Sequence, residues 1–151
     1  MTTPRPKRKG KKAPSSRGSH EWRFLTASAV EALHQETLAE HGGLGGVRDK
    51  GLLTSALSRC KNKVGYETEP TVHALAAALA YGLAKNHPFH DGNKRIALIA
   101  SFTFAELNGL HMTATEAEAA KTFLALAAGE ISEVNLARWF EAHSNVRRAR
   151  K

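Results

Sequence analysis

The chain has 151 residues, of which 42% are hydrophobic, and a formal net charge of +8. This length is typical of one domain with a single core. No stretch approaches the roughly 20 consecutive apolar residues of a membrane span, and the basic N-terminus lacks the apolar region of a secretory signal. The single cysteine, Cys60, allows no internal disulfide. We therefore expect a protein of the reducing cytoplasm with no membrane partner.

The positive charge lies at the two ends of the chain. Eleven of the 22 Lys and Arg residues fall within residues 1–19 and 147–151, so the other 11 face 14 acids and the body carries a net charge of −3. A leader of Lys, Pro, Gly and Ser cannot bury enough apolar surface to fold. We predict a disordered basic tail over residues 1–22, a helical domain over 23–143 and a basic tail over 144–151. Nucleic acid would bind these tails weakly at most.

Two helices are predicted before residue 64. Thr26 can cap the first, and Gly42 ends it because glycine adopts a left-handed conformation at low cost. Asp49 can cap the second, which we expect to end between Cys60 and Lys63. Their apolar residues recur at helical spacing: Val30, Leu33 and Leu38, with Thr37, in the first helix, and Leu52, Leu53, Ala56 and Leu57 in the second.

The centre of the chain carries the most apolar predicted helix. β-formers beside acids over residues 64–69 predict a loop or one small hairpin. Pro70 then suits the first turn of a helix over residues 70–86. The alanines and leucines of this helix occupy more than one face, which is typical of an enclosed central helix. His87 follows at its end, and Pro88 prevents simple continuation.

Three more helices complete the prediction. The first spans residues 93–108, and the second spans residues 115–128 after Thr113 or Thr115. Ser132 caps the third. The sequence therefore predicts an all-α single domain, a compact bundle of about six helices with a central helix-loop-helix unit and at most one short hairpin.

Residues 87–95 read His-Pro-Phe-His-Asp-Gly-Asn-Lys-Arg and join the two central helices. The second of these helices points the free amides of Gly92, Asn93 and Lys94 at the loop, and such a helix N-terminus attracts anions. Lys94 and Arg95 add full positive charge, and a guanidinium can bind two phosphate oxygens. The segment therefore predicts a binding site for the phosphates of a nucleotide.

Two further groups in this segment predict transfer chemistry. Asp91 is a hard oxygen ligand that could hold Mg²⁺ through one contact while phosphates and waters complete the octahedron. His87 could accept the proton of an attacking hydroxyl, because a neutral imidazole is the usual base near pH 7. Each residue also has a purely structural interpretation as a cap or turn residue. His90 is expected at the surface or facing a substrate, and Phe89 is expected to pack beneath the loop.

The chain resembles the Doc branch of the Fic/Doc superfamily over about residues 25–140. The resemblance rests on residues 87–95 and on the upstream block Val-Arg-Asp-Lys-Gly-Leu-Leu-Thr-Ser-Ala-Leu-Ser-Arg at residues 47–59. It implies a Fic/Doc-like helical domain with His87 as the base and Asp91 as the metal residue. The phosphates of ATP would then be bound by Gly92, Asn93, Lys94 and Arg95.

Position 94 distinguishes two reactions within the superfamily. In Fic enzymes that transfer AMP this position is typically glycine, whereas here it is Lys94. Resemblance to the Doc branch therefore implies a toxin that transfers the γ-phosphoryl group of ATP to a protein hydroxyl, with elongation factor Tu as the target and translation arrest as the result. Gly92 and Pro88 look more like general Fic proteins, so AMP transfer stays open as an alternative.

The resemblance also implies a partner protein. Several Fic proteins carry an inhibitory helix in which Ser or Thr is followed four positions later by Glu and then by Gly or Asn, and this sequence has no such pattern. Inhibition would then come in trans from a cognate antitoxin that is disordered until it binds the toxin.

Two interpretations outside the superfamily compete with this one. His90-Asp91 is the dipeptide of HD-type metal phosphohydrolases, but such a site needs further His and Asp ligands. The chain has only two aspartates, Asp49 and Asp91. A non-catalytic helical binding module, basic at both ends, is the alternative outside enzymology.

Overall fold

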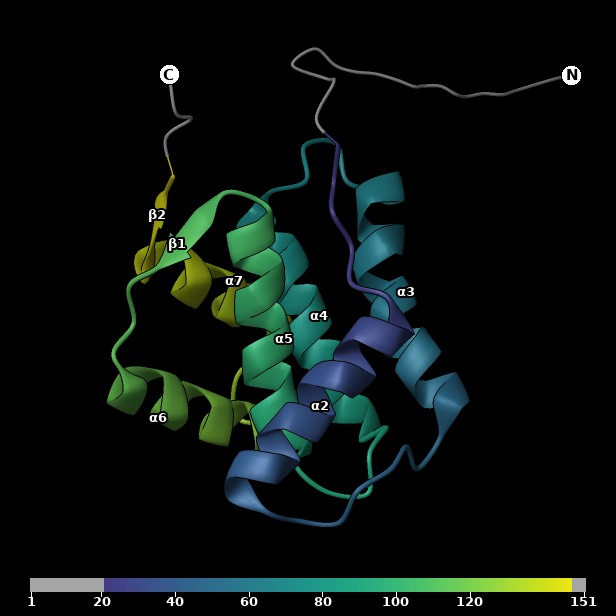
Figure 1. Ribbon diagram of the computed structural model, residues 1–151. Helices are drawn as coiled ribbons and strands as arrows, with labels where there is room; N and C mark the ends of the chain where they lie inside the picture. The colour runs from purple at the N-terminus through teal and green to yellow at the C-terminus, as the bar shows by residue number, and fades with distance from the viewer. Residues whose placement is uncertain (1–20, 148–151) are drawn as a thin grey trace, which may run out of the picture.

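The computed structural model describes residues 21–147, so the predicted disorder of residues 1–20 and the last residues of the predicted C-terminal tail lie outside the described residues. The described chain forms six helices and two short strands (Figure 1). The helices are α2 (Ala27–His41), α3 (Lys50–Tyr66), α4 (Val72–Asn86), α5 (Asn93–Leu107), α6 (Glu116–Ala127) and α7 (Glu133–Ala142), and the strands are β1 (Leu110–Met112) and β2 (Ser144–Val146). The predicted all-α class is confirmed. No described helix combines the length and the apolarity needed to cross a bilayer.

Helix α4 lies at the centre of the bundle and packs against α3, α5 and α7 (Figure 1). Its buried residues are mostly small: Leu75, Ala76, Ala77, Ala78, Leu79, Ala80, Gly82, Leu83 and Ala84. Small side chains let neighbouring helices approach on several sides. At Gly82 a Cβ would lie only 3.2 Å from the Ala56 Cα of α3. The enclosed position predicted from the alanine-rich pattern is confirmed, and it places the loop after α4 at the end of the best-packed element.

Side-chain oxygens cap the helices. The predicted caps Thr26, Asp49 and Ser132 each accept a hydrogen bond from the backbone amide three residues further on, and Thr115 does the same for α6. The prediction that Pro70 lies in the first turn of α4 was wrong, because the helix begins after Thr71, whose hydroxyl accepts the amide of Ala74. The Thr71 hydroxyl thus satisfies one of the free backbone amides in the first turn of the helix. The side chain of proline has no hydrogen-bond acceptor and could not do so.

Helix α3 runs to Tyr66, so the prediction that it ends between Cys60 and Lys63 was wrong. Residues 64–66 are helical and belong to no loop or hairpin, and only the residues after Tyr66 form a connection to α4. The β preference of this stretch is a weak local signal that tertiary contacts override.

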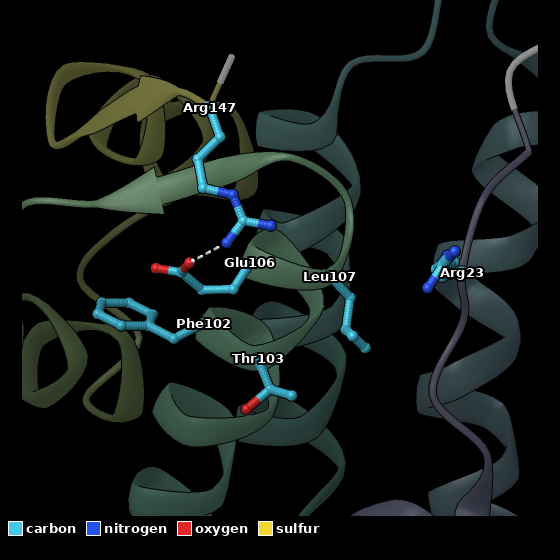
Figure 2. A pocket seen from close by; sticks show the side chains of 6 residues that line it. All are labelled: Arg23, Phe102, Thr103, Glu106, Leu107 and Arg147. Carbon is cyan, nitrogen blue, oxygen red and sulfur yellow. Dashed lines mark hydrogen bonds and ion pairs between the residues drawn. The ribbon is translucent and has the colours of Figure 1, made fainter. Parts of the chain in front are cut away.

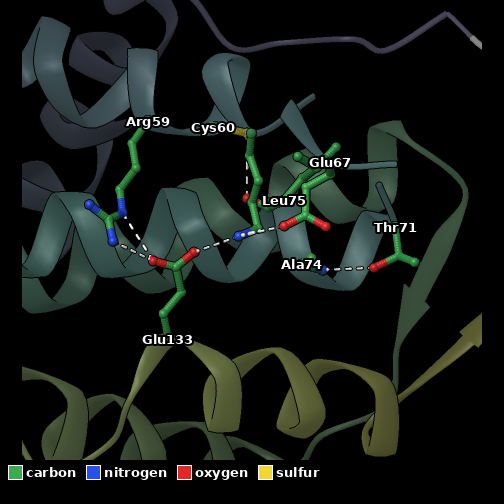
Figure 3. Close-up of polar contacts among 8 residues, drawn as sticks. Arg59, Cys60, Glu67, Thr71, Ala74, Leu75 and Glu133 are labelled. Atoms are coloured by element: carbon green, nitrogen blue, oxygen red, sulfur yellow. Dashed lines mark hydrogen bonds and ion pairs between the residues drawn. The ribbon is translucent and has the colours of Figure 1, made fainter. Parts of the chain in front are cut away.

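A network of ion pairs joins the end of α3 to α7 and supplies tertiary contacts for this part of the helix (Figure 3). Lys63 Nζ lies 3.4 Å from Glu67 and 3.2 Å from Glu133, and Arg59 Nε donates to Glu133 at 3.1 Å. Burial alone would lower the pKa of Lys63, but the hydrogen bond and charge of Glu133 raise it overall. Burial, with a smaller contribution from Glu133, also raises the pKa of the Cys60 thiol to about 12. The thiol is therefore protonated and unreactive at neutral pH.

Strands β1 and β2 pair antiparallel although α6 and α7 separate them in the sequence. Leu110 lies opposite Val146, and the Arg147 amide donates to the Gly109 carbonyl at 2.7 Å. Residues 144–146 therefore belong to the folded domain, whereas the sequence placed them in the C-terminal tail. Two strands of three residues leave no periodic signal that a sequence pattern could detect.

Candidate functional site

The end of α4 presents His87 to solvent. His87 is the C-cap of the helix and adopts a left-handed backbone conformation with φ 50, the only non-glycine residue among those described with a positive φ. Such a residue ends a helix sharply, and Pro88 cannot extend the hydrogen-bond ladder. The chain leaves the helix axis here, and the His87 side chain is exposed rather than packed in the core. An imidazole in this position is accessible to a substrate.

The loop that follows is closed by two anchors. Phe89 is 1% exposed and fills the core beneath the loop, as predicted. The Asn93 side chain holds the backbone of Phe89 through both of its polar atoms: Oδ1 accepts the Phe89 amide at 3.0 Å and Nδ2 donates to the Phe89 carbonyl at 2.9 Å. Asn93 is itself buried. Its carboxamide therefore shapes the loop, and only its backbone amide is left to bind an anion.

Residues 46–49 run alongside the loop and tie it to the start of α3. Val47 and Phe89 form an isolated antiparallel bridge. Arg48 Nε donates to the carbonyl of His87 at 2.8 Å, and its guanidinium also reaches the carbonyl of Asn86 at 3.1 Å. These carbonyls end α4, where a cation is favourable. Arg48 thus holds the backbone on both sides of the point where the chain turns.

A buried histidine from α2 lies beneath the other half of the loop. His34 is 1% exposed, and its ring stacks on Phe89 with 3.9 Å between centroids. Its Nε2 lies 2.8 Å from the carbonyl oxygen of Asp91. The loop therefore rests on α2 as well as on α3.

The Asp91 carboxylate is exposed and faces two backbone amides. One oxygen accepts the amide of Gly92 at 2.9 Å and the other accepts the amide of Leu44 at 3.3 Å. The described residues contain no group of three or more His, Cys, Asp or Glu side chains that could hold a metal ion. Among the described residues that line the hollow here, Asp91 is the one acid, so a cation would have a single carboxylate ligand. This arrangement suits Mg²⁺ accompanied by phosphates and waters.

Helix α5 begins at the loop with backbone amide donors and two cationic side chains. Gly92 is its N-cap in a left-handed conformation with φ 76, and no side chain caps this end. The prediction that the Gly92 amide is free was wrong, because the adjacent Asp91 carboxylate accepts it. The amides of Asn93 and Lys94 have no acceptor within the helix. Neither Lys94 nor Arg95 takes part in an ion pair with another described residue.

These groups surround one open hollow of about 540 Å³. All six predicted site residues line it: His87, Asp91, Gly92, Asn93, Lys94 and Arg95. The loop before α3 forms part of its wall through Gly42 and Gly43, and a Cβ on Gly43 would lie 3.0 Å from the Asp91 carboxylate. An imidazole, a carboxylate, two cations and a helix N-terminus thus share one space, which is the inventory of a group-transfer site for phosphates.

Sequence reasoning missed His34 and Arg48. A histidine at the spacing of Val30 and Thr37 on the inner face of a helix was a detectable signal, because a buried polar ring must have a partner. Arg48 lies in the block at residues 47–59 that carried the resemblance, but nothing local indicated that it reaches the end of α4.

A second hollow, of about 460 Å³, lies at the opposite end of α5 (Figure 2). Two of its charged side chains pair with each other: Arg147 lies 3.2 Å from Glu106, whose other oxygen accepts the Met112 amide at 3.0 Å. Figure 2 shows the Glu106 and Arg147 side chains turned toward each other. Its remaining lining is Arg23, Phe102, Thr103 and Leu107.

Comparison with known proteins assigns the fold and the loop to one family. The model of the Fic/DOC family matches residues 24–105, a stretch that covers α2, α3, α4, the loop and most of α5. The chain therefore belongs to the Fic/DOC family.

Two relatives within this class carry the name Doc. The chain is 30% identical over 115 residues to "Protein kinase doc" of Escherichia phage P1, a match that covers 76% of this chain and 90% of the relative. It is 45% identical over 74 residues to "Toxin Doc" of Mycolicibacterium smegmatis, a match that covers 48% of this chain and 57% of that relative.

Proposed function

We propose that this protein is a Doc-type toxin that transfers the γ-phosphoryl group of ATP to a hydroxyl group of a protein substrate. The observation that carries the proposal is the hollow that an exposed His87 shares with the N-terminus of α5, where Lys94 and Arg95 pair with no other described residue. One relative is named a kinase and the other a toxin. Elongation factor Tu is the target that the resemblance implies, with arrest of translation as the result.

The phosphates of ATP would bind at the start of α5. The amides of Asn93 and Lys94 offer hydrogen bonds along the positive end of the helix dipole. Lys94 adds a point charge, and the planar guanidinium of Arg95 can bind two phosphate oxygens. Asp91 would hold Mg²⁺, which when bound supplies neutralisation of phosphate charge. Asp91 is exposed and is the one acid among the described residues that line the hollow, which leaves room for that ion and the phosphates together.

His87 would accept the proton of the substrate hydroxyl. As that oxygen forms its bond to the γ-phosphorus, the bond between the γ-phosphorus and the bridging oxygen breaks, ADP leaves, and the hydroxyl proton passes to the imidazole. Such base catalysis contributes about 10² to 10⁴-fold. Positioning and charge neutralisation by the α5 N-terminus supply the larger share.

Transfer of AMP is the second candidate, and one observation favours it. Gly92 has a left-handed φ of 76 and follows a loop that contains Pro88, as in general Fic proteins. The two reactions differ in the orientation of ATP, for which Lys94 is the discriminating residue. We expect Lys94→Gly to shift the product from a phosphorylated toward a nucleotidylated protein. An unchanged product would show that Lys94 does not set the orientation.

Labelled nucleotides test the proposal directly. The purified protein with Mg²⁺ and γ-labelled ATP should label elongation factor Tu, and α-labelled ATP should label no protein. Label from the α-phosphate alone would overturn phosphoryl transfer in favour of AMP transfer. Absence of label from both would favour a non-catalytic helical binding module.

An antitoxin acting in trans is part of the same proposal. Coexpression of the protein with the product of a small neighbouring reading frame should restore growth to cells that the toxin arrests. Persistent arrest in the presence of a neighbouring product that binds the toxin would contradict this arrangement.

A further inference from the structure

His34 occupies a position where a polar ring is costly. It lies on the inner face of α2, between Val30 and Thr37, and is 1% exposed. A buried imidazole that made no hydrogen bond would destabilise the fold, because the loss of its contacts with water would not be compensated. An apolar residue would fill the same space without that cost, so the contacts of the ring are informative.

Two contacts define the orientation of the ring. It lies nearly parallel to Phe89, with 14° between the planes and 3.9 Å between the centroids. Its Nε2 lies 2.8 Å from the carbonyl oxygen of Asp91. Because a carbonyl oxygen can only accept, Nε2 must carry the hydrogen, and the tautomer of the ring is thereby fixed.

The same ring also lies next to the space that a side chain of residue 92 would occupy. A Cβ added to Gly92 would lie 3.5 Å from His34 Nε2, an ordinary van der Waals distance, so a side chain at this position would touch the ring. His34 therefore holds the carbonyl side of the peptide bond between Asp91 and Gly92 and borders its other side. This peptide connects the carboxylate that faces the hollow to the N-cap of α5.

We propose that His34 is a positioning residue for the site. Its Nε2–H holds the Asp91 carbonyl, and this hydrogen bond sets where the Asp91 carboxylate and the first amides of α5 stand relative to His87. The role rests on the proposed function of the hollow, because it acts through residues that bind metal and phosphate there. A displacement of about 1 Å in a reacting constellation can cost about 10²-fold in rate.

Two substitutions separate the hydrogen bond from the packing. His34→Gln retains a donor, because the carboxamide nitrogen of Gln is the same number of bonds from Cα as Nε2 of His, but it removes the stacked ring. His34→Phe retains a stacked ring and removes the donor. Thr37→Val is the matched control, because it deletes a buried hydroxyl that donates only to the His34 carbonyl of its own helix at 2.8 Å.

We expect His34→Phe to lower the kcat of phosphoryl transfer about 10²-fold while KM for the protein target changes by less than about twofold. His34→Gln should recover at least about tenfold of that loss. Thr37→Val should lose stability without losing kcat. A His34→Phe variant with the kcat of the wild type, or a His34→Gln variant as slow as His34→Phe at equal stability, would overturn the positioning role.

Amide hydrogen exchange decides the proposal even if the protein transfers no phosphate. In the free protein, the hydrogen-bonded amides of His90, Gly92 and Ile96 should exchange faster in His34→Phe than in wild type, His34→Gln or Thr37→Val, while α7 should exchange equally in all four. Equal exchange of these three amides in all four proteins would refute the role of His34. A wild-type protein that labels no substrate would instead refute the proposed function and leave this comparison intact.

Discussion

The two ends of α5 carry hollows of similar size and opposite character. The N-terminal hollow is about 540 Å³ and the C-terminal hollow about 460 Å³, so volume alone does not distinguish them. At the N-terminus, Lys94 and Arg95 have no ion-pair partner in the described chain. At the C-terminus, Arg147 is paired with Glu106. In the proposed function, the free charge at the positive end of α5 binds phosphate, whereas the paired charge at the other end stabilises the fold.

The loop beside the N-terminal hollow is held in place by three side chains. Arg48 fixes the carbonyls at the end of α4, Asn93 fixes the backbone of Phe89, and His34 stacks on Phe89 and holds the Asp91 carbonyl. Polar atoms of these three side chains are hydrogen-bonded to the backbone of the loop, whereas the side chains of His87 and Lys94 stay exposed. Rigid support beneath unpaired functional groups is what transfer chemistry requires.

The largest effect is expected from His87→Ala. Loss of the proton acceptor should lower phosphoryl transfer by about 10² to 10⁴-fold and abolish growth arrest in cells. Because the side chain is exposed, the melting temperature should stay that of the wild type. His90→Ala is the control, since it removes a neighbouring exposed imidazole from the same hollow. A His87→Ala variant that remains toxic would remove His87 from the base role.

Arg95→Gln and Arg147→Gln compare the two ends of α5 directly. Loss of a charge-assisted bond worth about 1.5 to 3 kcal/mol should weaken ATP binding roughly 10- to 100-fold in Arg95→Gln. Arg147→Gln should leave ATP affinity unchanged, as measured by calorimetry. Equal losses in the two variants would mean that the hollows do not differ in function.

Glu133→Gln tests stability away from both hollows. Removing the carboxylate that joins Arg59 and Lys63 should lower the free energy of unfolding by about 1 to 3 kcal/mol, because both cations lose a charged acceptor. The pKa of Lys63 is raised in the folded protein. The charged form of Lys63 therefore contributes to the stability of the fold below the ordinary lysine pKa of about 10.4, and this contribution is lost as the pH rises through the raised pKa.

Denaturation in urea should thus show that the difference in the free energy of unfolding between wild type and Glu133→Gln becomes smaller in strongly alkaline solution. Phosphoryl transfer at neutral pH should not change. A gap that widens above about pH 10.4 would contradict the direction of the Lys63 shift.

The smallest effect concerns the cap of α6. Thr115→Ala should cost about 1 kcal/mol of stability, with no effect on ATP binding.

The backbone hydrogen bond from Thr115 lowers the pKa of Glu118. The charged form of Glu118 therefore stabilises the fold above the ordinary glutamate pKa of about 4.3, and this contribution is lost as the pH falls through the lowered value. Acid titration of stability in wild type and Glu118→Gln would check the sign.

Local signals in the sequence predicted most of the helices and six of the residues that line the N-terminal hollow. Thr26, Asp49 and Ser132 could be identified as caps because a short polar side chain directly precedes an apolar repeat. The loop could be interpreted because its polar residues are consecutive in the chain. These features depend only on neighbouring residues.

The features that were missed depend on contacts between distant segments. The last turn of α3 is held by Glu133 of α7, and β1 finds its partner only after two intervening helices. Arg48 and His34 act on the loop from 39 and 57 residues away. Hydrophobic spacing carries no information on which distant polar groups will meet.

A titration of backbone amides by NMR tests the central claim most directly. Addition of ATP with Mg²⁺ to the wild-type protein should shift the amide signals of Gly92, Asn93 and Lys94 and leave those of Glu106 and Leu107 in place. Shifts confined to Glu106 and Leu107, or no shifts at residues 92–94 at saturating nucleotide, would contradict the assignment of the phosphate site to the N-terminus of α5.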